Sequence, residues 1–472
     1  MNFASIAFVV LFALVFLARL TIGRRRTEPA FIAVLVVAST VFYAWHVPTY
    51  LALLLLSAGV DYIAARRIAD AAPDATRYRR LLLIVSLSAN LGLLGFFKYF
   101  EFLLRSAVDV LSWFGPVAAP PDLGIVLPMG ISFYTFQSMS YTIDVYRGVL
   151  QPYRSFAPFY LFISFFPQLV AGPIVRATEW VPQAAKPRRL RLVSFYEGAW
   201  LMVLGFFFKL VVADNLGAIV NTQWAAAAVP GGAAWPALLV ALLFSGQIFA
   251  DFAGYSGIAI GLGYLLGFRF PENFRAPYIA ASFREFWTRW HITLSRWLRD
   301  YLYIPLGGNR KGRARTEINL LLVMLLGGLW HGAAYRFIIW GAIHGVALAV
   351  ERQLGMDGAS RRRGALATVG WFLVVQAVVL VGWVFFRSQT HGEALGLLGN
   401  IVSLRGGDAP PWGFAGVMFL MPLVVHHVWW WVTEHRLARP LGARGRTILA
   451  ALMLMAMATI SGSAGDFLYF QF

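Results

Sequence analysis

Long apolar stretches recur along almost the whole chain, and clusters of basic residues separate them. A helix needs about 20 mostly apolar residues to cross a bilayer. Stretches of that kind lie near residues 2–22, 30–46, 48–65, 81–105, 124–146, 193–213, 236–266, 365–386, 413–432 and 447–465. The pattern therefore predicts an all-α polytopic membrane protein with about ten transmembrane helices.

Two further apolar stretches, 156–172 and 318–350, differ from the others because basic residues flank them at both ends. Cytoplasmic loops collect Lys and Arg, so both ends of each stretch are expected on the cytoplasmic side. We interpret them as re-entrant or broken hairpins, which a membrane tolerates only where protein surrounds them. Interfacial helices on the cytoplasmic side complete the predicted fold.

The same basic clusters predict the orientation of the chain. Arg24, Arg25 and Arg26 directly follow the first apolar stretch, and no basic residue precedes it. If the basic clusters face the cytoplasm, both termini lie outside, and the first stretch is not a cleaved signal.

Composition supports the membrane class and narrows the chemistry. Hydrophobic residues make up 59% of the 472 residues and charged residues only 13%, whereas soluble domains have about a quarter charged. The 40 Lys and Arg residues against 22 Asp and Glu give a net charge of +18. We attribute this charge to membrane orientation rather than to nucleic-acid binding. The absence of Cys excludes disulfides, thiolate metal sites and an acyl-cysteine intermediate.

His331 is an imidazole inside an apolar stretch, beside Gly327, Gly328 and Gly332. A helix beginning at Ile318 would carry it about 20 Å along the axis, near the middle of the bilayer. Ionisable groups at that depth usually face a polar cavity, so we predict a functional site. A histidine that only packs against a neighbouring helix is the alternative. The glycines would admit either another backbone or a substrate.

His291 lies in an aromatic and basic segment over residues 282–301. Ser282 followed by Glu285 is a capping-box pattern, which predicts that one helix starts here and lies at the membrane surface. A lipid-facing anchor is one interpretation of this segment. A direct role for His291 is the other, because the predicted helix places Trp287 on the same face and the imidazole at the mouth of the membrane.

A Gly-rich turn after this segment carries Asn309, Arg310, Lys311 and Arg313. Successive backbone amides and cations could hold a phosphorylated ligand there, although a basic turn that only sets orientation is the alternative. The spacing of a Walker A loop is missing. Asp251 is an acid inside an apolar span, and we expect it to orient an imidazole or a backbone turn, or to line a proton path.

Several longer motifs resemble a known family. They are Asp251-Phe-Ala-Gly-Tyr-Ser, Phe270-Pro-Glu-Asn-Phe, Phe286-Trp-Thr-Arg-Trp-His-Ile-Thr-Leu-Ser-Arg-Trp-Leu-Arg-Asp-Tyr and Gly327-Gly-Leu-Trp-His-Gly-Ala. These motifs are similar to those of the membrane-bound O-acyltransferases, and within them to the alginate O-acetyltransferase-like branch. The final segment, 467–472, fits the same branch. The chain departs from the branch pattern at Ala253, Gly257 and Ala334.

The resemblance implies an O-acetyltransferase that moves acetyl from cytoplasmic acetyl-CoA toward an extracytoplasmic polysaccharide, such as an alginate-like exopolysaccharide. It places the family's catalytic histidine at His331 and the second, upstream histidine at His291. Trp330, Asp251 and Asp300 are expected to support the site. The residues expected to hold acetyl-CoA are Asn309, Arg310, Lys311 and Arg313.

The resemblance also implies a setting and partners. We expect a multi-pass protein of the bacterial inner membrane, with both termini periplasmic and a periplasmic SGNH-type acetyltransferase as partner. Membrane lipids are expected partners. No nucleic acid, metal or permanently bound cofactor is expected. The chain then forms a single membrane-bound O-acyltransferase domain, with N-terminal spans over 1–146, a catalytic core over 147–350 and C-terminal spans over 351–472.

Physical chemistry is compatible with this function and leaves alternatives. Transfer from a thioester to a hydroxyl needs a base, and a neutral imidazole has a pKa near the working pH. Peptidoglycan or another cell-surface glycan is an alternative acceptor. Broken helices with intramembrane His and Asp also describe a proton-coupled transporter, and a scaffold for polysaccharide export is a third possibility.

Overall fold

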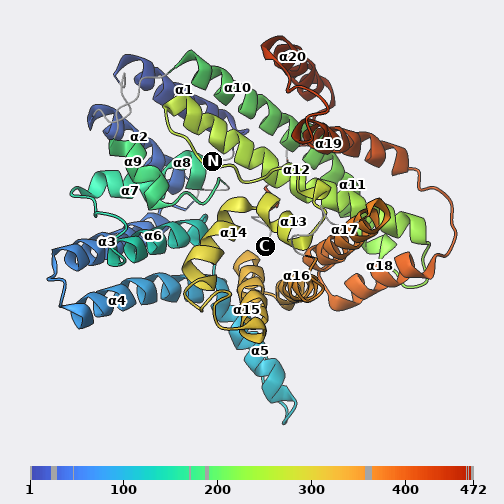
Figure 1. The fold of residues 1–472 in the computed structure, drawn as a ribbon, viewed down its shortest axis with the longest axis horizontal. Helices are drawn as coiled ribbons and strands as arrows, with labels where there is room; N and C mark the ends of the chain where they lie inside the picture. Colours follow the sequence, from blue (N-terminus) through green and yellow to red (C-terminus); the bar gives the residue numbers. More distant parts are fainter. Residues whose placement is uncertain are drawn as a thin grey trace. The chain divides into compact units, whose positions relative to one another are not determined.

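The computed structural model describes residues 3–22, 29–45, 47–169, 172–185, 191–356, 364–463, 465 and 467–468. Helices make up the regular structure of these residues, and the described ranges contain no strand (Figure 1). The predicted all-α class is therefore confirmed. The basic residues at 24–26, 186–190 and 361–363 and the last four residues of the chain lie outside the described ranges.

Several helices have the length and composition of membrane spans. Within the described ranges six qualify: Thr76–Ser112, Leu192–Ala227, Ala234–Leu266, Ala365–Arg387, Gly413–Glu434 and Ala443–Ile460. Shorter apolar helices cover Ile6–Thr21, Pro29–Ala44 and Phe156–Leu169. A multi-pass membrane protein follows, whereas the count of ten crossings and the re-entrant depth of two hairpins stay predictions.

The helices group into two compact units. The first contains residues Met1–Ala199 and Ala259–Pro271, and the second contains Trp200–Ile258 and Glu272–Phe472. The first unit holds α1 (Ile6–Thr21), α2 (Pro29–Ala44), α3 (Tyr50–Asp70), α4 (Thr76–Leu94), the π-helical turn η1 (Gly95–Tyr99), α5 (Phe100–Ser112), α6 (Ile131–Tyr146), α7 (Phe156–Ser164), α8 (Phe166–Leu169) and α9 (Ala177–Ala185). Helices α10 (Leu192–Phe206) and α12 (Ala234–Leu266) contribute residues to both units.

The second unit holds the remaining helices. They are the π-helical turn η2 (Phe207–Ala213), α11 (Asp214–Ala227), the short turn η3 (Pro277–Ile279), α13 (Phe283–Arg289), α14 (Ile292–Leu298), the π-helical turn η4 (Arg299–Tyr303), α15 (Arg313–His331), α16 (Tyr335–Gln353), α17 (Ala365–Arg387), α18 (His391–Ser403), α19 (Gly413–Glu434) and α20 (Ala443–Ile460).

A polar cluster joins three helices of the first unit. Asp61 on α3 is fully buried and accepts hydrogen bonds from Ser86 and Asn90 on α4 and from Ser138 on α6. Asn90 accepts in turn from Ser57 on α3, at 2.8 Å. A buried carboxyl is costly unless its oxygens find donors. The three donors therefore fix α3, α4 and α6 to one another.

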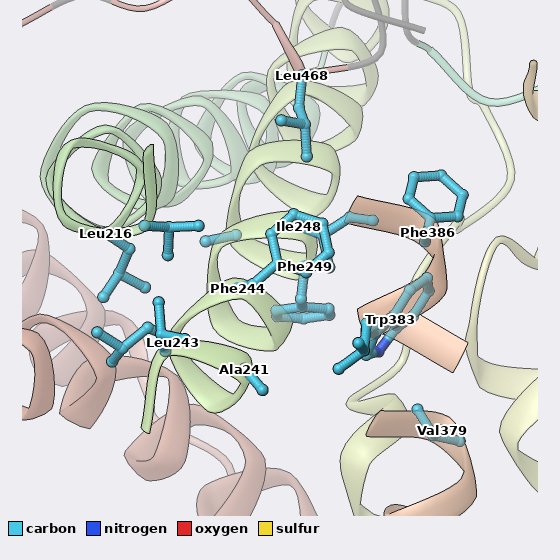
Figure 2. Packing of buried hydrophobic residues seen from close by; sticks show 14 of the residues in the cluster. Leu216, Ala241, Leu243, Phe244, Ile248, Phe249, Val379, Trp383, Phe386 and Leu468 are labelled. Carbon is cyan, nitrogen blue, oxygen red and sulfur yellow. The ribbon is translucent and has the colours of Figure 1, made fainter. Parts of the chain in front are cut away.

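The core of the second unit is aromatic and aliphatic. Figure 2 shows how α11, α12 and α17 contribute side chains to it. Among the buried members are Leu216, Leu243, Phe244, Ile248, Phe249, Val379, Trp383 and Phe386. This core supports the helices that carry the polar residues of the second unit.

Helices α15 and α16 form a closely packed hairpin. A Cβ atom on Gly328 would lie 2.1 Å from the carbonyl oxygen of Phe337, and one on Gly341 would lie 2.3 Å from that of Met324. Both separations are far below van der Waals contact, so only glycine allows this approach of the two backbones. The chain leaves the helical conformation at Gly332 and re-enters it after Ala334. The hairpin thus places His331 at the end of α15.

Candidate functional site

A cavity of about 680 Å³ lies in the second unit, with walls formed by α13, α14, α15, α16 and η4. This volume is in the range that accommodates a small organic ligand. Most of its wall is apolar, including Ile292, Leu294, Leu298 and Val323. Its polar lining comes from the imidazole of His331, several arginines and the buried carboxylate of Glu351.

His331 reaches the cavity from the end of α15, and its side chain is almost fully buried. Its ring centroid lies 5.0 Å from that of Trp340, 5.3 Å from Trp330 and 5.5 Å from Phe386. These rings leave the imidazole few rotamers, since a packed side chain cannot rotate without displacing its neighbours. The structure therefore places the predicted site residues His331 and Trp330 in contact and His331 at a cavity.

The predicted single helix over 282–301 is wrong, because the chain breaks at Trp290 and His291. His291 adopts a left-handed backbone conformation with φ of 41°. Main-chain bonds to the preceding segment replace the helical ones: the N–H of Ile292 donates to the carbonyl of Asn273 at 2.9 Å. Trp290 and Trp297 are 2% and 5% exposed, which contradicts a lipid-facing anchor for these two side chains.

The break turns His291 toward the interior and close to His331. Its Nδ1 lies 3.0 Å from Oδ1 of Asn273, and its ring centroid lies 6.3 Å from that of His331. Burial lowers the pKa of His291 to about 3, so the imidazole is neutral at physiological pH. Although His291 contacts His331 and Trp330, it does not line the cavity itself.

The cations of the cavity are not the ones predicted from the Gly-rich turn. Asn309 lines the cavity, whereas Arg310, Lys311 and Arg313 do not. Four other arginines take part in the lining: Arg284, Arg296, Arg299 and Arg352. Sequence reasoning missed them because they come from α13, α14, η4 and α16, and only the fold brings these elements together.

Asp300 was predicted to support the site, and its described ion pair is with the adjacent Arg299. The two side chains pair at 2.6 Å, and this hydrogen bond raises the pKa of Arg299. Asp300 does not line the cavity. Its contact therefore orients one of the lining arginines.

Glu351 was also missed by sequence reasoning. It is fully buried on α16 and accepts from the backbone N–H groups of Phe283 and Arg284 at 2.8 and 2.9 Å, and from the indole of Trp371 at 3.2 Å. The first N–H groups of a helix have no partner within it. Glu351 supplies that partner for α13 and fixes the start of the segment that leads to His291.

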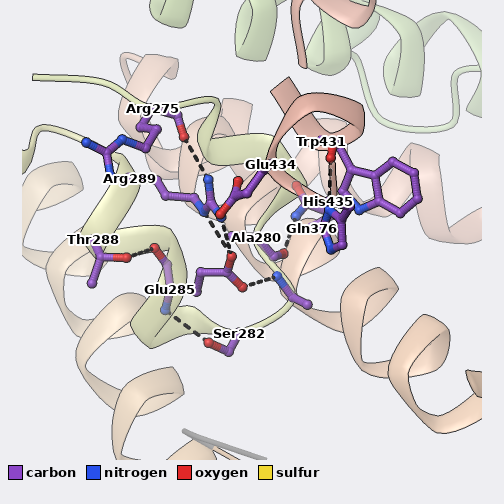
Figure 3. A network of polar contacts seen from close by, with 11 residues as sticks. Arg275, Ala280, Ser282, Glu285, Thr288, Arg289, Gln376, Trp431, Glu434 and His435 are labelled. Carbon is purple, nitrogen blue, oxygen red and sulfur yellow. Dashed lines mark hydrogen bonds and ion pairs between the residues drawn. The ribbon is translucent and has the colours of Figure 1, made fainter. Parts of the chain in front are cut away.

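A second network fixes the other end of α13 (Figure 3). Arg289 donates to Glu285 at 2.9 Å and to Glu434 of α19 at 2.8 Å. The predicted capping box is confirmed at Ser282, whose hydroxyl accepts from the N–H of Glu285 at 3.0 Å. With both of its ends bound, α13 holds the His291 break in place.

Asp251 binds a cation and a backbone N–H. Its Oδ1 lies 2.8 Å from Nζ of Lys209, and its Oδ2 accepts from the N–H of Leu468 at 2.8 Å. Lys209 also pairs with Asp214 at 2.7 Å. Of the three predicted roles for Asp251, these contacts favour orienting a backbone turn, here near the C-terminus. Sequence reasoning missed Lys209, although a lysine within an apolar span is itself a signal.

His344 lies near His331 because the hairpin is broken between them. Both rings contact Trp340, with centroids 5.0 Å away for His331 and 4.9 Å for His344. A straight helix would have placed the two histidines on different faces. The break at Gly332 thus creates an aromatic cluster around both imidazoles.

Comparison with known proteins identifies the family. Residues 150–356 match the model of MBOAT, the membrane-bound O-acyltransferase family. The chain is 43% identical over 407 residues to a probable alginate O-acetylase of Pseudomonas putida, a match that covers 85% of this chain and 80% of the relative. The corresponding protein of Pseudomonas aeruginosa is 45% identical over 393 residues, or 82% of this chain and 72% of the relative. A peptidoglycan O-acetyltransferase of Helicobacter pylori is 38% identical over 400 residues, or 79% and 74%.

These matches favour an enzyme over a transporter or a scaffold, and they agree with the motifs around His291 and His331. The chain therefore belongs to the membrane-bound O-acyltransferase family, within its alginate O-acetyltransferase-like branch, and is an O-acyltransferase.

Proposed function

We propose that this protein transfers acetyl from cytoplasmic acetyl-CoA toward an extracytoplasmic polysaccharide in the bacterial inner membrane. The observation that carries the proposal is a single cavity that contains both the imidazole of His331 and four arginines. An imidazole can take the proton of a hydroxyl acceptor, and arginines can bind the phosphates of a phosphorylated donor. The cavity thus provides the two kinds of group that the reaction needs.

The donor is held by charge at one part of the cavity and by apolar contact along the rest. Arginine binds phosphate oxygens with two parallel hydrogen bonds, so Arg284, Arg296, Arg299 and Arg352 suit the phosphates of CoA. The apolar side chains of α14 and α15 suit its long thioester arm. In this arrangement Asn309 contributes a neutral hydrogen-bonding group, while Arg310, Lys311 and Arg313 act only through their charge.

His331 is the proposed general base of the transfer. Its imidazole takes the proton of the acceptor hydroxyl as that oxygen attacks the thioester carbonyl. The C–S bond breaks, the new C–O ester bond forms, and the thiolate of CoA leaves and recovers a proton. Because the chain has no Cys, direct transfer needs the fewest steps. His291, whose ring centroid lies 6.3 Å from that of His331, supports it.

The acceptor proposed is an alginate-like exopolysaccharide, with peptidoglycan as the second candidate. Relatives named for alginate are 43% and 45% identical, and the relative named for peptidoglycan is 38% identical. A periplasmic SGNH-type acetyltransferase is the proposed partner that completes delivery to the polymer. The basic clusters between the apolar stretches support a topology with both termini in the periplasm.

The experiment is an assay of CoA release by the purified protein in detergent. Wild-type protein with acetyl-CoA and an acceptor oligosaccharide is expected to release CoA and to form acetyl ester. His331→Ala should lower the rate by about 10²–10⁴-fold, the usual effect of removing a general base. His435→Ala is the matched control, because His435 is exposed beyond the end of α19. Undiminished transfer by His331→Ala would contradict the proposal.

The acceptor is identified by comparing oligomannuronate with peptidoglycan fragments in the same assay, with and without a periplasmic fraction. Acetyl ester on oligomannuronate supports the first candidate, and ester on muropeptides alone replaces it with the second. If CoA release by the wild type needs neither acceptor nor fraction, the proposed transfer to a glycan is wrong.

A further inference from the structure

Asn273 is a buried amide that the proposed chemistry has not used. It belongs to the motif at residues 270–274 that leads from α12 toward α13, and its exposed fraction is 1%. The side chain lies between two parts of the second unit: α12, through Ser256, and the break between α13 and α14, through His291 and Thr293.

The side-chain oxygen, the side-chain nitrogen and the main-chain carbonyl of Asn273 each take part in hydrogen bonds. Its Oδ1 lies 3.0 Å from Nδ1 of His291, 2.9 Å from Oγ1 of Thr293 and 3.4 Å from the backbone nitrogen of Thr293. Its Nδ2 donates to the hydroxyl of Ser256 at 3.1 Å. Its main-chain carbonyl accepts from the N–H of Ile292 at 2.9 Å.

The backbone N–H of Thr293 decides which way the amide points. The oxygen and nitrogen of an Asn side chain have nearly the same shape, so their assignment rests on the hydrogen-bond network. A backbone N–H can only donate, which requires that the atom facing it is the oxygen of Asn273. The same oxygen faces Nδ1 of His291, and an oxygen of an amide can only accept.

The protonation pattern of His291 follows. Nδ1 must carry the hydrogen, because its partner accepts. A neutral imidazole has a single N–H, so Nε2 carries a lone pair. Burial lowers the pKa of His291 to about 3, which keeps the ring neutral. Nε2 is buried and has no hydrogen-bond partner among the described residues.

We propose that Asn273 is a positioning residue that holds His291 in the Nδ1–H tautomer, so that Nε2 accepts a hydrogen bond from His331 when His331 is protonated during transfer. The ring centroids are 6.3 Å apart, and a small approach on substrate binding closes the remaining gap, as is common for catalytic hydrogen bonds. His291 stabilises the charged ring without taking its proton. This inference rests on the proposed function of His331.

The ion-paired groups near His291 are bound to residues other than His291, so its tautomer is set by the hydrogen bond to Asn273. His331 is the titratable ring in contact with it on α15. On α13, Arg289 is paired with Glu285 and Glu434. On α12, Asp251 lies next to Phe252, whose ring contacts His291, and is paired with Lys209.

The direct test is nitrogen NMR of the protein labelled with ¹⁵N-histidine in detergent, which distinguishes protonated from unprotonated ring nitrogens. The His291 signals are assigned by their loss in His291→Gln. We expect Nδ1 protonated and Nε2 unprotonated in the wild type, and a mixture of tautomers in Asn273→Ala. An Nε2–H tautomer in the wild type would overturn the inference, whatever the activity of the protein.

The kinetic test is the pH profile of CoA release. Asn273→Asp keeps an acceptor beside Nδ1 but adds a negative charge, which raises the pKa of His291 from its low value and favours, in acid, a charged ring that no longer accepts at Nε2. Relative to the wild type at the same pH, we expect kcat to fall at least tenfold at about pH 5 and to recover as the pH rises to neutrality, with KM for acetyl-CoA within about twofold. Asn273→Ala should lower kcat without moving the profile to alkaline pH.

Asn400→Asp is the matched control, because Asn400 is another buried amide of the second unit, 2% exposed, which donates to the carbonyls of Ala227 and Val229. It should lower stability but leave the pH profile of the remaining activity in place. An unshifted profile in Asn273→Asp would refute the positioning role. Absence of activity in the wild type would refute the proposed function instead, and the NMR result would stand apart from it.

Discussion

His331 and the cavity arginines lie on different elements, and the fold brings them together at one cavity. The imidazole comes from α15, and Arg284, Arg296, Arg299 and Arg352 come from the segments around it. Glu351 lines the cavity, whereas Asn273 does not. They hold the segment that carries His291 through a side-chain bond and through the start of α13.

Substitution of the cavity arginines tests whether acetyl-CoA binds in the cavity or at the Gly-rich turn. Arg296→Ala and Arg352→Ala should each raise KM for acetyl-CoA about tenfold, because a charged hydrogen bond to phosphate is worth about 1.4 kcal/mol or more. Arg310→Ala should change KM less than twofold, since Arg310 does not line the cavity. Initial rates of CoA release at varied acetyl-CoA measure all three. Equal effects of the three substitutions would return the donor site to the Gly-rich turn.

His291 makes a prediction about acid stability. Its pKa is about 3 in the folded protein and about 6.5 when exposed. The unfolded chain therefore binds the proton more tightly, and stability is lost as the pH falls from about 6.5 toward 3. His291→Gln should remove this share, about 3 kcal/mol at pH 4.5. Thermal unfolding in detergent at pH 7.5 and 4.5 measures it, and an equal loss in both proteins would contradict the low pKa.

At the scale of elements, two breaks in helices build the site. One separates α13 from α14 at His291, and the other separates α15 from α16 after His331. The capping box at Ser282 and the glycines near His331 were visible in the sequence. The first break was not, because the segment has helical spacing throughout, and hydrogen bonds to Asn273 outweigh that local preference.

The hairpin glycines predict a sharp difference between substitutions. Gly328→Ala and Gly341→Ala should lower stability by about 1–3 kcal/mol or more and abolish transfer, because the new methyl meets a backbone carbonyl. Gly370→Ala on α17 is the control, since a Cβ there meets nothing within 4 Å. Unfolding temperature and CoA release report both effects. Wild-type behaviour of Gly328→Ala would mean that the two helices do not pack this closely.

The Asp61 cluster predicts a similar contrast in the first unit. Asp61→Ala leaves the donors of Ser86, Asn90 and Ser138 without an acceptor, which should cost about 2 kcal/mol. Asp61→Asn keeps an acceptor oxygen and should cost less. The unfolding temperatures of both variants and of the wild type measure this difference. Equal unfolding temperatures for the two variants would contradict a stabilising effect of the retained acceptor oxygen.

At the scale of the whole molecule, apolar length and basic clusters dominate. The helices with the composition of membrane spans coincide with apolar stretches of the sequence, because lipid requires both a long apolar surface and internally bonded backbone. The described helices also divide into two compact units, a division that the succession of spans did not reveal.

Topology supplies the prediction at this scale. Alkaline phosphatase folds only in the periplasm, so its fusion to either end of the chain should give active enzyme. Green fluorescent protein fused to either end should not fluoresce, because it would be exported to the periplasm. Fusions after residue 315, within a basic cluster, should give the opposite result. A fluorescent protein at the C-terminus would reverse the proposed orientation.

The membrane class, the helical architecture, the two histidines and the family motifs can be predicted from the amino-acid order alone, because these depend on local composition and on short runs of residues. Which cations line the cavity, where the helix breaks at His291, what Asp251 binds and how Asn273 and Glu351 act follow only from the folded arrangement. Those features depend on contacts between residues far apart in the chain, such as Asn273 with His291 and Glu351 with Phe283. Helical spacing predicts which face a residue takes, but only packing decides which partner meets that face.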